Sequence, residues 1–212
     1  MIKAFLKRTK FYSIYRQYVN RKFHETAVET AYFNRGSFVD EFIPKNSTGA
    51  EIGVLKGEFT EVLLSKAKPQ MLHLIDPWYQ LGSYWSWTTG NQSTVEAVIE
   101  IHKRFKPELG SGKMQIHIGD DQILLPVFPD EYFDWVYLDS SHTYEDTVTE
   151  LVLLSKKVKK SGVICGDDWQ PDPSHKHHGV CKAIREFVEI NPYKIIYADK
   201  ENLQWALKYT KD

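Results

Sequence analysis

Short apolar segments alternate with helical patterns from residue 48 onward, and this alternation constrains the fold more than any other feature. Strands that alternate with helices form a largely parallel sheet covered by helices on both faces. The sequence therefore predicts an α/β domain with a doubly wound sheet over residues 48–212. Strand patterns lie at 48–54, 71–75, 114–118, 133–138 and 162–166. Helical patterns lie at 57–66, 93–105, 144–158 and 180–190.

The chain ends in two further strand patterns, at 193–198 and 203–209, separated by the polar residues 199–202. A short polar segment between two strand patterns is typical of a hairpin turn. We therefore expect the mostly parallel sheet to end in a C-terminal antiparallel hairpin. An ordinary dinucleotide-binding sheet continues with parallel crossovers instead, so this hairpin argues against that class.

The composition is that of an ordinary globular domain. Of the 212 residues, 42% are hydrophobic and 26% are charged, which disfavours disorder and a disulfide scaffold. No apolar run approaches the ~20 residues of a membrane-spanning helix, and the first residues lack the features of a signal peptide. We therefore expect a soluble, cytoplasmic protein in which Cys165 and Cys181 are reduced and buried.

Residues 1–47 are expected to form an N-terminal helical extension in front of the domain. Residues 1–24 carry seven basic residues and no acidic residue, and their apolar residues recur three or four positions apart. This pattern predicts an amphipathic helix, which could bind an anionic membrane or a polyanion. Packing against the body or against a second subunit is the stronger interpretation. The sequence does not decide whether this helix forms a homo-oligomer. No nucleic-acid partner is expected.

The first motif with chemical meaning runs from Glu51 through Gly53 to Gly57, between a strand and a helix. The two glycines let the backbone approach a ligand, and the start of the helix offers N–H groups. A dinucleotide fingerprint would need glycine at position 55, where this chain has Leu55. The carboxylate of Glu51 suits a ligand with cationic character, such as S-adenosylmethionine. The alternative is that both glycines serve helix packing alone.

Acidic residues also close the second and third strands. Asp76 could accept hydrogen bonds from both ribose hydroxyls of a nucleoside, although a strand-end acid can also be a simple turn cap. Gly119 and Asp120 end the third strand, where Asp120 could accept a hydrogen bond from an adenine amino group. Asp121 is expected to cap the short helix that follows.

Three carboxylates and one imidazole follow the fourth and fifth strands. Asp139 and His142 come after the fourth strand, and Asp167 and Asp168 come after the fifth. Adjacent parallel strands bring their carboxyl ends together, and neighbouring carboxylates repel one another unless a cation joins them. Oxygen ligands favour Mg²⁺, with Ca²⁺ or Mn²⁺ as alternatives. The three acids are therefore candidate metal ligands, and Asp139 and His142 are candidate catalytic residues with His142 as the base. Ordinary loop capping is the alternative.

Together these motifs resemble class I S-adenosylmethionine-dependent O-methyltransferases, which have a Rossmann-like fold. The resemblance is closest to the metal-dependent macrocin-type sugar O-methyltransferases and more distant to catechol O-methyltransferase. It implies that Glu51, Gly53 and Gly57 hold the methionine end of the cofactor and that Asp76 holds its ribose. It also implies that the three strand-end acids bind Mg²⁺ and that His142 is the base, where the catechol enzyme has lysine. The chain is shorter than the sugar enzymes, which carry longer N-terminal and lid elements.

A long loop after the second strand is rich in aromatic residues. It could form a lid that covers a sugar or a planar substrate, and Trp85 and Trp87 are the candidate substrate contacts within it. Alternatively, the rings are packing residues or a docking surface for the N-terminal helix. The aromatic residues of this loop are Trp78, Tyr79, Tyr84, Trp85 and Trp87.

Trp169 and His178, in the loop after the fifth strand, are two further candidate substrate contacts. The histidine cluster at 175–178 lacks a cysteine or an acid at ligand spacing, which disfavours zinc and favours a solvated loop beside the substrate. Trp135 and Trp205 lie within strand patterns and are expected in the core.

The predicted function is transfer of a methyl group from S-adenosylmethionine to a hydroxyl of a small molecule, a sugar, glycan or other vicinal diol, with Mg²⁺ orienting the acceptor. A nicotinamide-dependent oxidoreductase is the alternative enzyme class, disfavoured by Leu55 and the terminal hairpin. A non-catalytic binding protein on a methyltransferase-like fold is the alternative outside the enzymes. The identity of the acceptor, the metal and the oligomeric state are left open.

Overall fold

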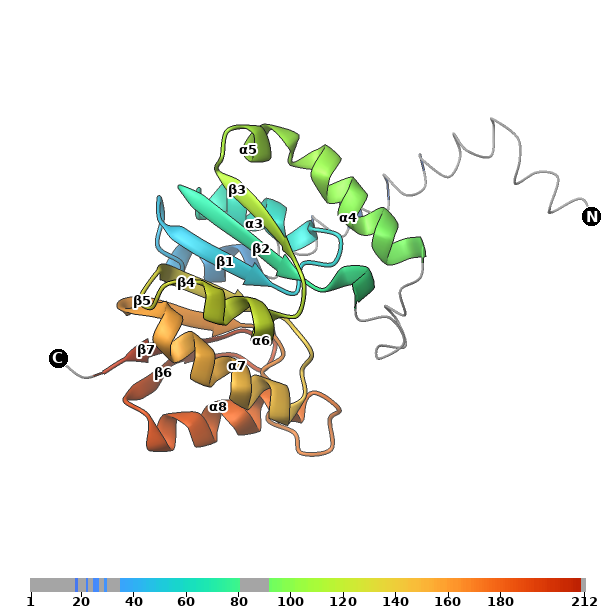
Figure 1. Cartoon of the computed structure of the whole chain (residues 1–212). Helices are drawn as coiled ribbons and strands as arrows, with labels where there is room; N and C mark the ends of the chain where they lie inside the picture. Colours follow the sequence, from blue (N-terminus) through green and yellow to red (C-terminus); the bar gives the residue numbers. More distant parts are fainter. Residues whose placement is uncertain are drawn as a thin grey trace, which may run out of the picture.

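The computed structural model describes residues 35–80 and 92–210, together with residues 18, 22, 25, 26 and 29. These residues contain a seven-stranded sheet with the order β3-β2-β1-β4-β5-β7-β6, which Figure 1 shows with its helices. Strands β1 to β5 pair in parallel, whereas β7 runs antiparallel to both β5 and β6. The strands are β1 (Thr48–Ile52), β2 (Met71–Asp76), β3 (Met114–Ile118), β4 (Phe133–Leu138), β5 (Val158–Gly166), β6 (Tyr193–Ala198) and β7 (Trp205–Tyr209).

The sheet is the predicted Rossmann-like, doubly wound one, and it ends in the predicted antiparallel hairpin, so both expectations are confirmed. One boundary differs from the sequence pattern. β5 begins at Val158, which pairs with Phe133, and not at Gly162. The polar residues 159–161 concealed the first half of this strand, because they lie on its accessible part and interrupt the apolar pattern.

Helices cover both faces of the sheet (Figure 1), and each face has its own group of buried apolar residues. Along β4, Trp135 and Tyr137 belong to one group, whereas Val136 and Leu138 belong to the other, because successive strand residues point to opposite faces. The helices are α3 (Glu58–Lys66), α4 (Gln92–Arg104), α5 (Lys106–Gly110), α6 (Asp121–Leu124), η2 (Leu125–Val127), α7 (Tyr144–Lys157) and α8 (His178–Ile190).

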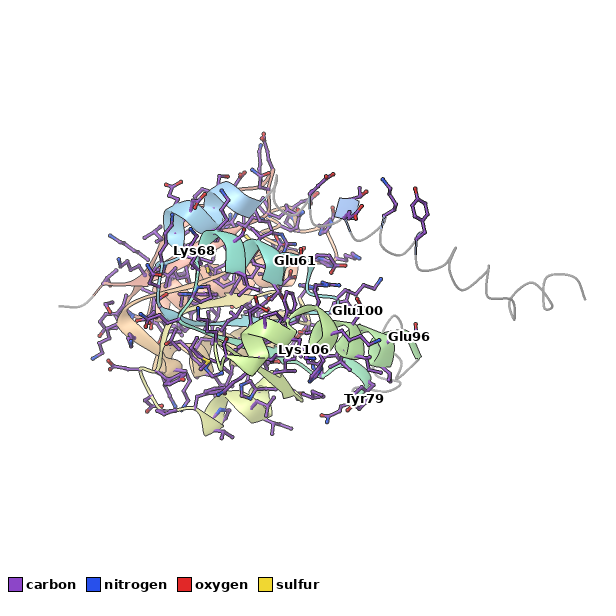
Figure 2. The ribbon with its side chains drawn as sticks, turned by 90° about the horizontal axis from the view of Figure 1, so that it is seen from above. Glu61, Lys68, Tyr79, Glu96, Glu100 and Lys106 are labelled. Atoms are coloured by element: carbon purple, nitrogen blue, oxygen red, sulfur yellow. The ribbon has the colours of Figure 1, made fainter. Side chains whose placement is uncertain are left out.

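The side chains of α3 and α4 pack on one face of the sheet, and those of α7 and α8 pack on the other. On the outer side of α4, Glu96 and Glu100 are exposed, and Figure 2 labels both. Trp135, Trp205 and Cys165 are fully buried, and both cysteines are free thiols, as expected.

Helix 35–42 belongs to the packed body, although the sequence pattern placed it in a separate extension. Phe38 and Val39 are buried in the same apolar group as α3 and α4. The ring of Phe38 lies 6.2 Å from that of Tyr137 in β4 and 5.4 Å from that of Tyr197 in β6. The division after residue 47 stays a prediction, but helix 35–42 shares one group of buried apolar residues with the sheet.

Most of the basic segment at the N-terminus lies outside the described residues, so its expected helix, membrane contact and oligomer contact stay predictions. Among the residues that the structure describes, no helix is both long and apolar enough to cross a membrane. The cytoplasmic location also stays a prediction.

Substitution Phe38→Ala tests whether helix 35–42 is part of the domain. Because the ring is only 3% exposed and contacts the sheet, we expect the free energy of unfolding to fall by about 3–5 kcal/mol in urea titrations. The matched control is Ile190→Ala, which removes an exposed side chain at the end of α8 and should change stability by less than about 0.5 kcal/mol. A loss of similar size in both variants would contradict the assignment.

Candidate active site

The turn after β1 packs directly against the end of β4. Gly53 has a φ of 84°, and a Cβ added there would lie 1.8 Å from the carbonyl oxygen of Asp139. Gly57 has a φ of 75° and forms the N-cap of α3. Both glycines are therefore required by the backbone, since a side chain at position 53 would collide with β4 and both conformations are strained for other residues. The turn and the loop after β4 are held side by side.

Asp76 fixes the shape of this turn. One carboxylate oxygen accepts hydrogen bonds from the N–H groups of Val54 and Leu55, at 2.8 and 2.9 Å, and the other accepts from Trp78 N–H at 2.6 Å. Burial raises the pKa of Asp76 in spite of these three hydrogen bonds. The carboxylate thus serves as a turn cap, and its position at the end of β2 is also the one expected for a ribose contact.

Glu51 lies beneath the turn, in the middle of the buried sheet. Its side chain is 1% exposed and accepts a hydrogen bond from the Thr60 hydroxyl of α3 at 2.6 Å. Burial raises the pKa of Glu51 to about 8. A cationic group placed nearby would favour the ionised form, which is the electrostatic basis for expecting a cationic ligand here.

Asp120, and not Asp121, caps α6. The Asp120 carboxylate accepts a hydrogen bond from Gln122 N–H at 2.9 Å, so the expectation that Asp121 is the cap was wrong. The Asp121 side chain is buried, and burial together with the charge of Asp120 raises its pKa to about 7. Gly119 donates its N–H to the carbonyl of Asp76 at 3.1 Å, which ties the end of β3 to the end of β2.

Arg35 was not identified from the sequence, yet it lies at the centre of the carboxylate cluster. Its guanidinium donates to Asp139 at 3.0 Å and forms a second, shorter ion pair with Asp167. The charged group also lies over the rings of Phe59 and Tyr137, 5.0 and 5.9 Å from their centroids. Burial would lower the pKa of Arg35, but the phenol and the two carboxylates outweigh it and hold the pKa above its ordinary value.

The three expected metal ligands do converge, but they already have partners. Oxygen atoms of Asp139, Asp167 and Asp168 lie within 4.8 Å of one another. Two of the three carboxylates share the guanidinium of Arg35, and the third is bound by histidines. The oxygen chemistry suits Mg²⁺, but this arrangement already supplies the positive charge that a metal ion would supply. As arranged, the cluster therefore does not fit a resident divalent ion.

Asp168 accepts hydrogen bonds from two histidines, each through a different carboxylate oxygen. The Nδ1 atoms of His142 and His177 both lie 2.8 Å from it, and the two rings stack with centroids 4.7 Å apart. Burial by itself would raise the pKa of Asp168 and lower that of His142. The hydrogen bond between the two side chains outweighs burial, so the pKa of Asp168 is lowered and the pKa of His142 is raised. His142 and Asp168 both have a φ of 62°, a strained backbone that often marks functional residues.

The histidine cluster before α8 contributes a residue that was not predicted, His177, whereas the expected substrate contact of His178 stays a prediction. His177 joins the site, whereas His178 points its Nδ1 at the carbonyl of Gln170, 2.9 Å away. His175 is exposed. The spacing of the histidines gave no means of choosing among them, because the path of the loop decides which ring faces Asp168.

The expected aromatic substrate contacts are only partly described. Trp85 and Trp87 lie outside the described residues, so their contact with substrate stays a prediction. Trp78 is a core residue, 1% exposed, whose indole donates to the carbonyl of Leu55 at 2.8 Å. Trp169 is also buried, with Arg185 over its ring, which is the position of a packing residue.

Solved structures share this fold at low sequence identity. A candidate S-adenosyl-L-methionine-dependent methyltransferase from Methanococcus maripaludis has a TM-score of 0.60 at 15% identity, covering 90% of both chains. The O-methyltransferase TomG from Streptomyces achromogenes, solved with its cofactor, has a TM-score of 0.56 at 15% identity, over 87% of this chain and 90% of that chain. Spermidine synthase from Thermotoga maritima has a TM-score of 0.50 at 17% identity, over 84% and 57%. These similarities define a fold shared by enzymes of different activities.

The family is shown by the sequence itself. Residues 50–169 match a protein-family model described as a methyltransferase domain. This match spans more than half of the chain and runs from β1 through the acidic pair after β5. The chain belongs to this methyltransferase family. A comparison with curated protein sequences gave no match.

Substitution Gly53→Ala tests the close contact between the turn and β4. Because the added Cβ would overlap the Asp139 carbonyl, we expect the free energy of unfolding in urea to fall by about 2 kcal/mol or more. Gly110→Ala is the matched control, since a Cβ at that helical glycine meets no atom within 4 Å and alanine favours a helix. Equal free energies of unfolding in the two variants would show that the turn accommodates the added Cβ without loss of stability.

Asp121→Asn tests the buried carboxyl group through pH. The pKa of Asp121 is about 7 in the folded protein and 3.8 ordinarily, so the folded state holds an extra proton between these values. The free energy of unfolding should therefore fall as the pH rises through this window, and the fall should be smaller in the variant. Urea titrations at several pH values measure this change in the free energy of unfolding. Asp130→Asn, which alters an exposed partner of Lys157, should keep the wild-type slope, and an unchanged slope in both variants would contradict the raised pKa.

Proposed function

We propose that this methyltransferase transfers a methyl group from S-adenosylmethionine to a hydroxyl of a small molecule, with His142 as the general base. The observation that carries the proposal is the His142–Asp168 pair, set at the carboxyl ends of β4 and β5 beside the Gly53 turn. In open α/β sheets, ligands bind at this edge. A base held next to the expected cofactor turn is what a proton-releasing methyl transfer needs.

The cofactor is assigned to the ends of β1, β2 and β3. The backbone of Gly53 and Gly57 can approach the methionine part closely, and the carboxylate of Glu51 lies below it. Asp76 holds the turn through the backbone N–H groups of Val54 and Leu55, and its position suits the ribose. Gly119 and Asp120 follow β3 and are assigned to the adenine side.

The orientation of His142 follows from its partner. The pKa of Asp168 is lowered, so this carboxylate is ionised and can only accept hydrogen bonds. The Nδ1 atom of His142 must therefore carry the proton, which leaves the lone pair on Nε2. S-adenosylmethionine supplies an electrophilic methyl group on a sulfonium. As the acceptor oxygen forms its bond to the methyl carbon and the carbon–sulfur bond breaks, Nε2 takes the hydroxyl proton.

The acceptor is assigned to the class of sugars and other vicinal diols on the strength of the resemblance alone. Asp139, next to the base and fixed by Arg35, lies where it could contact the acceptor. The Mg²⁺ that the sequence pattern predicts is left out of this proposal, because Arg35 already pairs with two of its expected ligands. Trp85 and Trp87 stay assigned to the lid, and His178 to the rim of the substrate site.

Two alternative functions are less well supported. A nicotinamide-dependent oxidoreductase is disfavoured because the chain belongs to a methyltransferase family. A non-catalytic binding protein is disfavoured by the His142–Asp168 pair, which holds a candidate base at the ligand-binding edge of the sheet.

His142→Ala tests the base. Methyl transfer from radiolabelled S-adenosylmethionine to a panel of sugars, polyols and catechols is measured first with the wild type to find an acceptor. With that acceptor we expect kcat to fall by about 10²–10⁴-fold, the range for losing a general base. Cofactor affinity should change little, because His142 lies after β4 and the cofactor residues end β1 to β3.

The matched control is His102→Ala, which removes an exposed imidazole from α4 and should keep wild-type turnover. Wild-type turnover in His142→Ala as well would contradict the role of His142. A loss of cofactor binding in that variant would show that the imidazole serves the cofactor site instead.

A further inference from the structure

The guanidinium of Arg35 spans the two carboxylates that a metal ion would use. One of its nitrogens lies 3.0 Å from Asp139, and the other contacts Asp167 in a shorter ion pair. A planar guanidinium with two donors toward two acids is a strong and directional arrangement. A divalent ion coordinated by the same two oxygens would need the space and the lone pairs that Arg35 takes.

Arg35 is held in this position from behind. Its charged group lies over Phe59 and Tyr137, at 5.0 and 5.9 Å from the ring centroids. It belongs to helix 35–42, which is anchored by the buried Phe38 and Val39. The side chain is therefore a preorganised, partly buried cation and not a surface arm that happens to reach an acid.

The Arg35 guanidinium and a divalent metal ion would compete for the same two carboxylates. Asp139 and Asp167 lie next to each other and need a positive partner, because neighbouring carboxylates in a partly buried site repel strongly. Arg35 supplies that charge within the chain. A divalent ion that bound beside the guanidinium would be repelled by it, and the repulsion is large at short distance in a site of reduced dielectric.

We propose that Arg35 is the resident cation of the Asp139–Asp167 pair and keeps divalent metal ions out of it. The chain thereby holds its strand-end carboxylates with a protein cation, in the place where the sequence pattern indicates a metal. This proposal does not depend on the methyl transfer proposed above, because metal binding can be measured without substrate or cofactor.

The test is a titration of the full-length protein with Mn²⁺, followed by the electron paramagnetic resonance signal of the free ion. Mn²⁺ is the probe because it prefers the same oxygen ligands as Mg²⁺. We expect Arg35→Gln to bind Mn²⁺ at least about tenfold more tightly than the wild type, since the competing charge is gone. Adding Asp139→Asn to that variant should abolish the gain, which places the ion at this pair.

Arg185→Met is the matched control, because it removes an arginine that lies over Trp169 instead of the carboxylates, and it should bind Mn²⁺ as the wild type does. Loss of Arg35 leaves two acids without their cation, so Arg35→Gln should melt at a lower temperature. Mn²⁺ should raise the melting temperature of this variant and not that of the wild type. Equal Mn²⁺ affinity in wild type and Arg35→Gln, or equal stabilisation of both by Mn²⁺, overturns the proposal.

Discussion

The contact between Gly53 and the carbonyl of Asp139 is the constraint on which the site depends. Only a residue without a Cβ allows the turn after β1 to lie against the end of β4, where the added atom would be 1.8 Å from the carbonyl oxygen. This contact places the expected cofactor turn beside the loop that carries His142. Asp76 then fixes the turn from the other side through the backbone N–H groups of Val54 and Leu55. The Gly53 contact and the Asp76 hydrogen bonds thus set the position of the expected cofactor turn relative to His142.

The charges at this edge are arranged in two separate sets. Arg35 joins Asp139 and Asp167, and the two histidines share Asp168. The division matters because Asp168 can orient the ring of His142 through a hydrogen bond from its Nδ1 atom. Helix 35–42 therefore contributes to the chemistry of the site as well as to the core, although it lies outside the family match at residues 50–169.

The sequence predicted the order of elements and the residues that end each strand, because strand periodicity and strand-end acids are local signals. It could not predict partners supplied by distant segments. Arg35 is paired across more than 100 residues with Asp139, and its only local signal is the helical spacing of Phe38 and Val39 behind it. His177 could not be distinguished from its neighbours, because the path of a loop and not its composition decides which ring faces Asp168. Trp78 was grouped with the lid residues because composition does not show which aromatic residues of a loop turn into the core, where Trp78 lies.

We propose that the ends of β1 to β3 form a site for S-adenosylmethionine. Isothermal titration calorimetry of the full-length protein measures this directly, with S-adenosylmethionine and NAD⁺ as the two ligands. We expect saturable binding of S-adenosylmethionine, weakened in Asp76→Ala, and no binding of NAD⁺. Absence of binding by S-adenosylmethionine and by its demethylated product, or saturable binding of NAD⁺ alone, would contradict it.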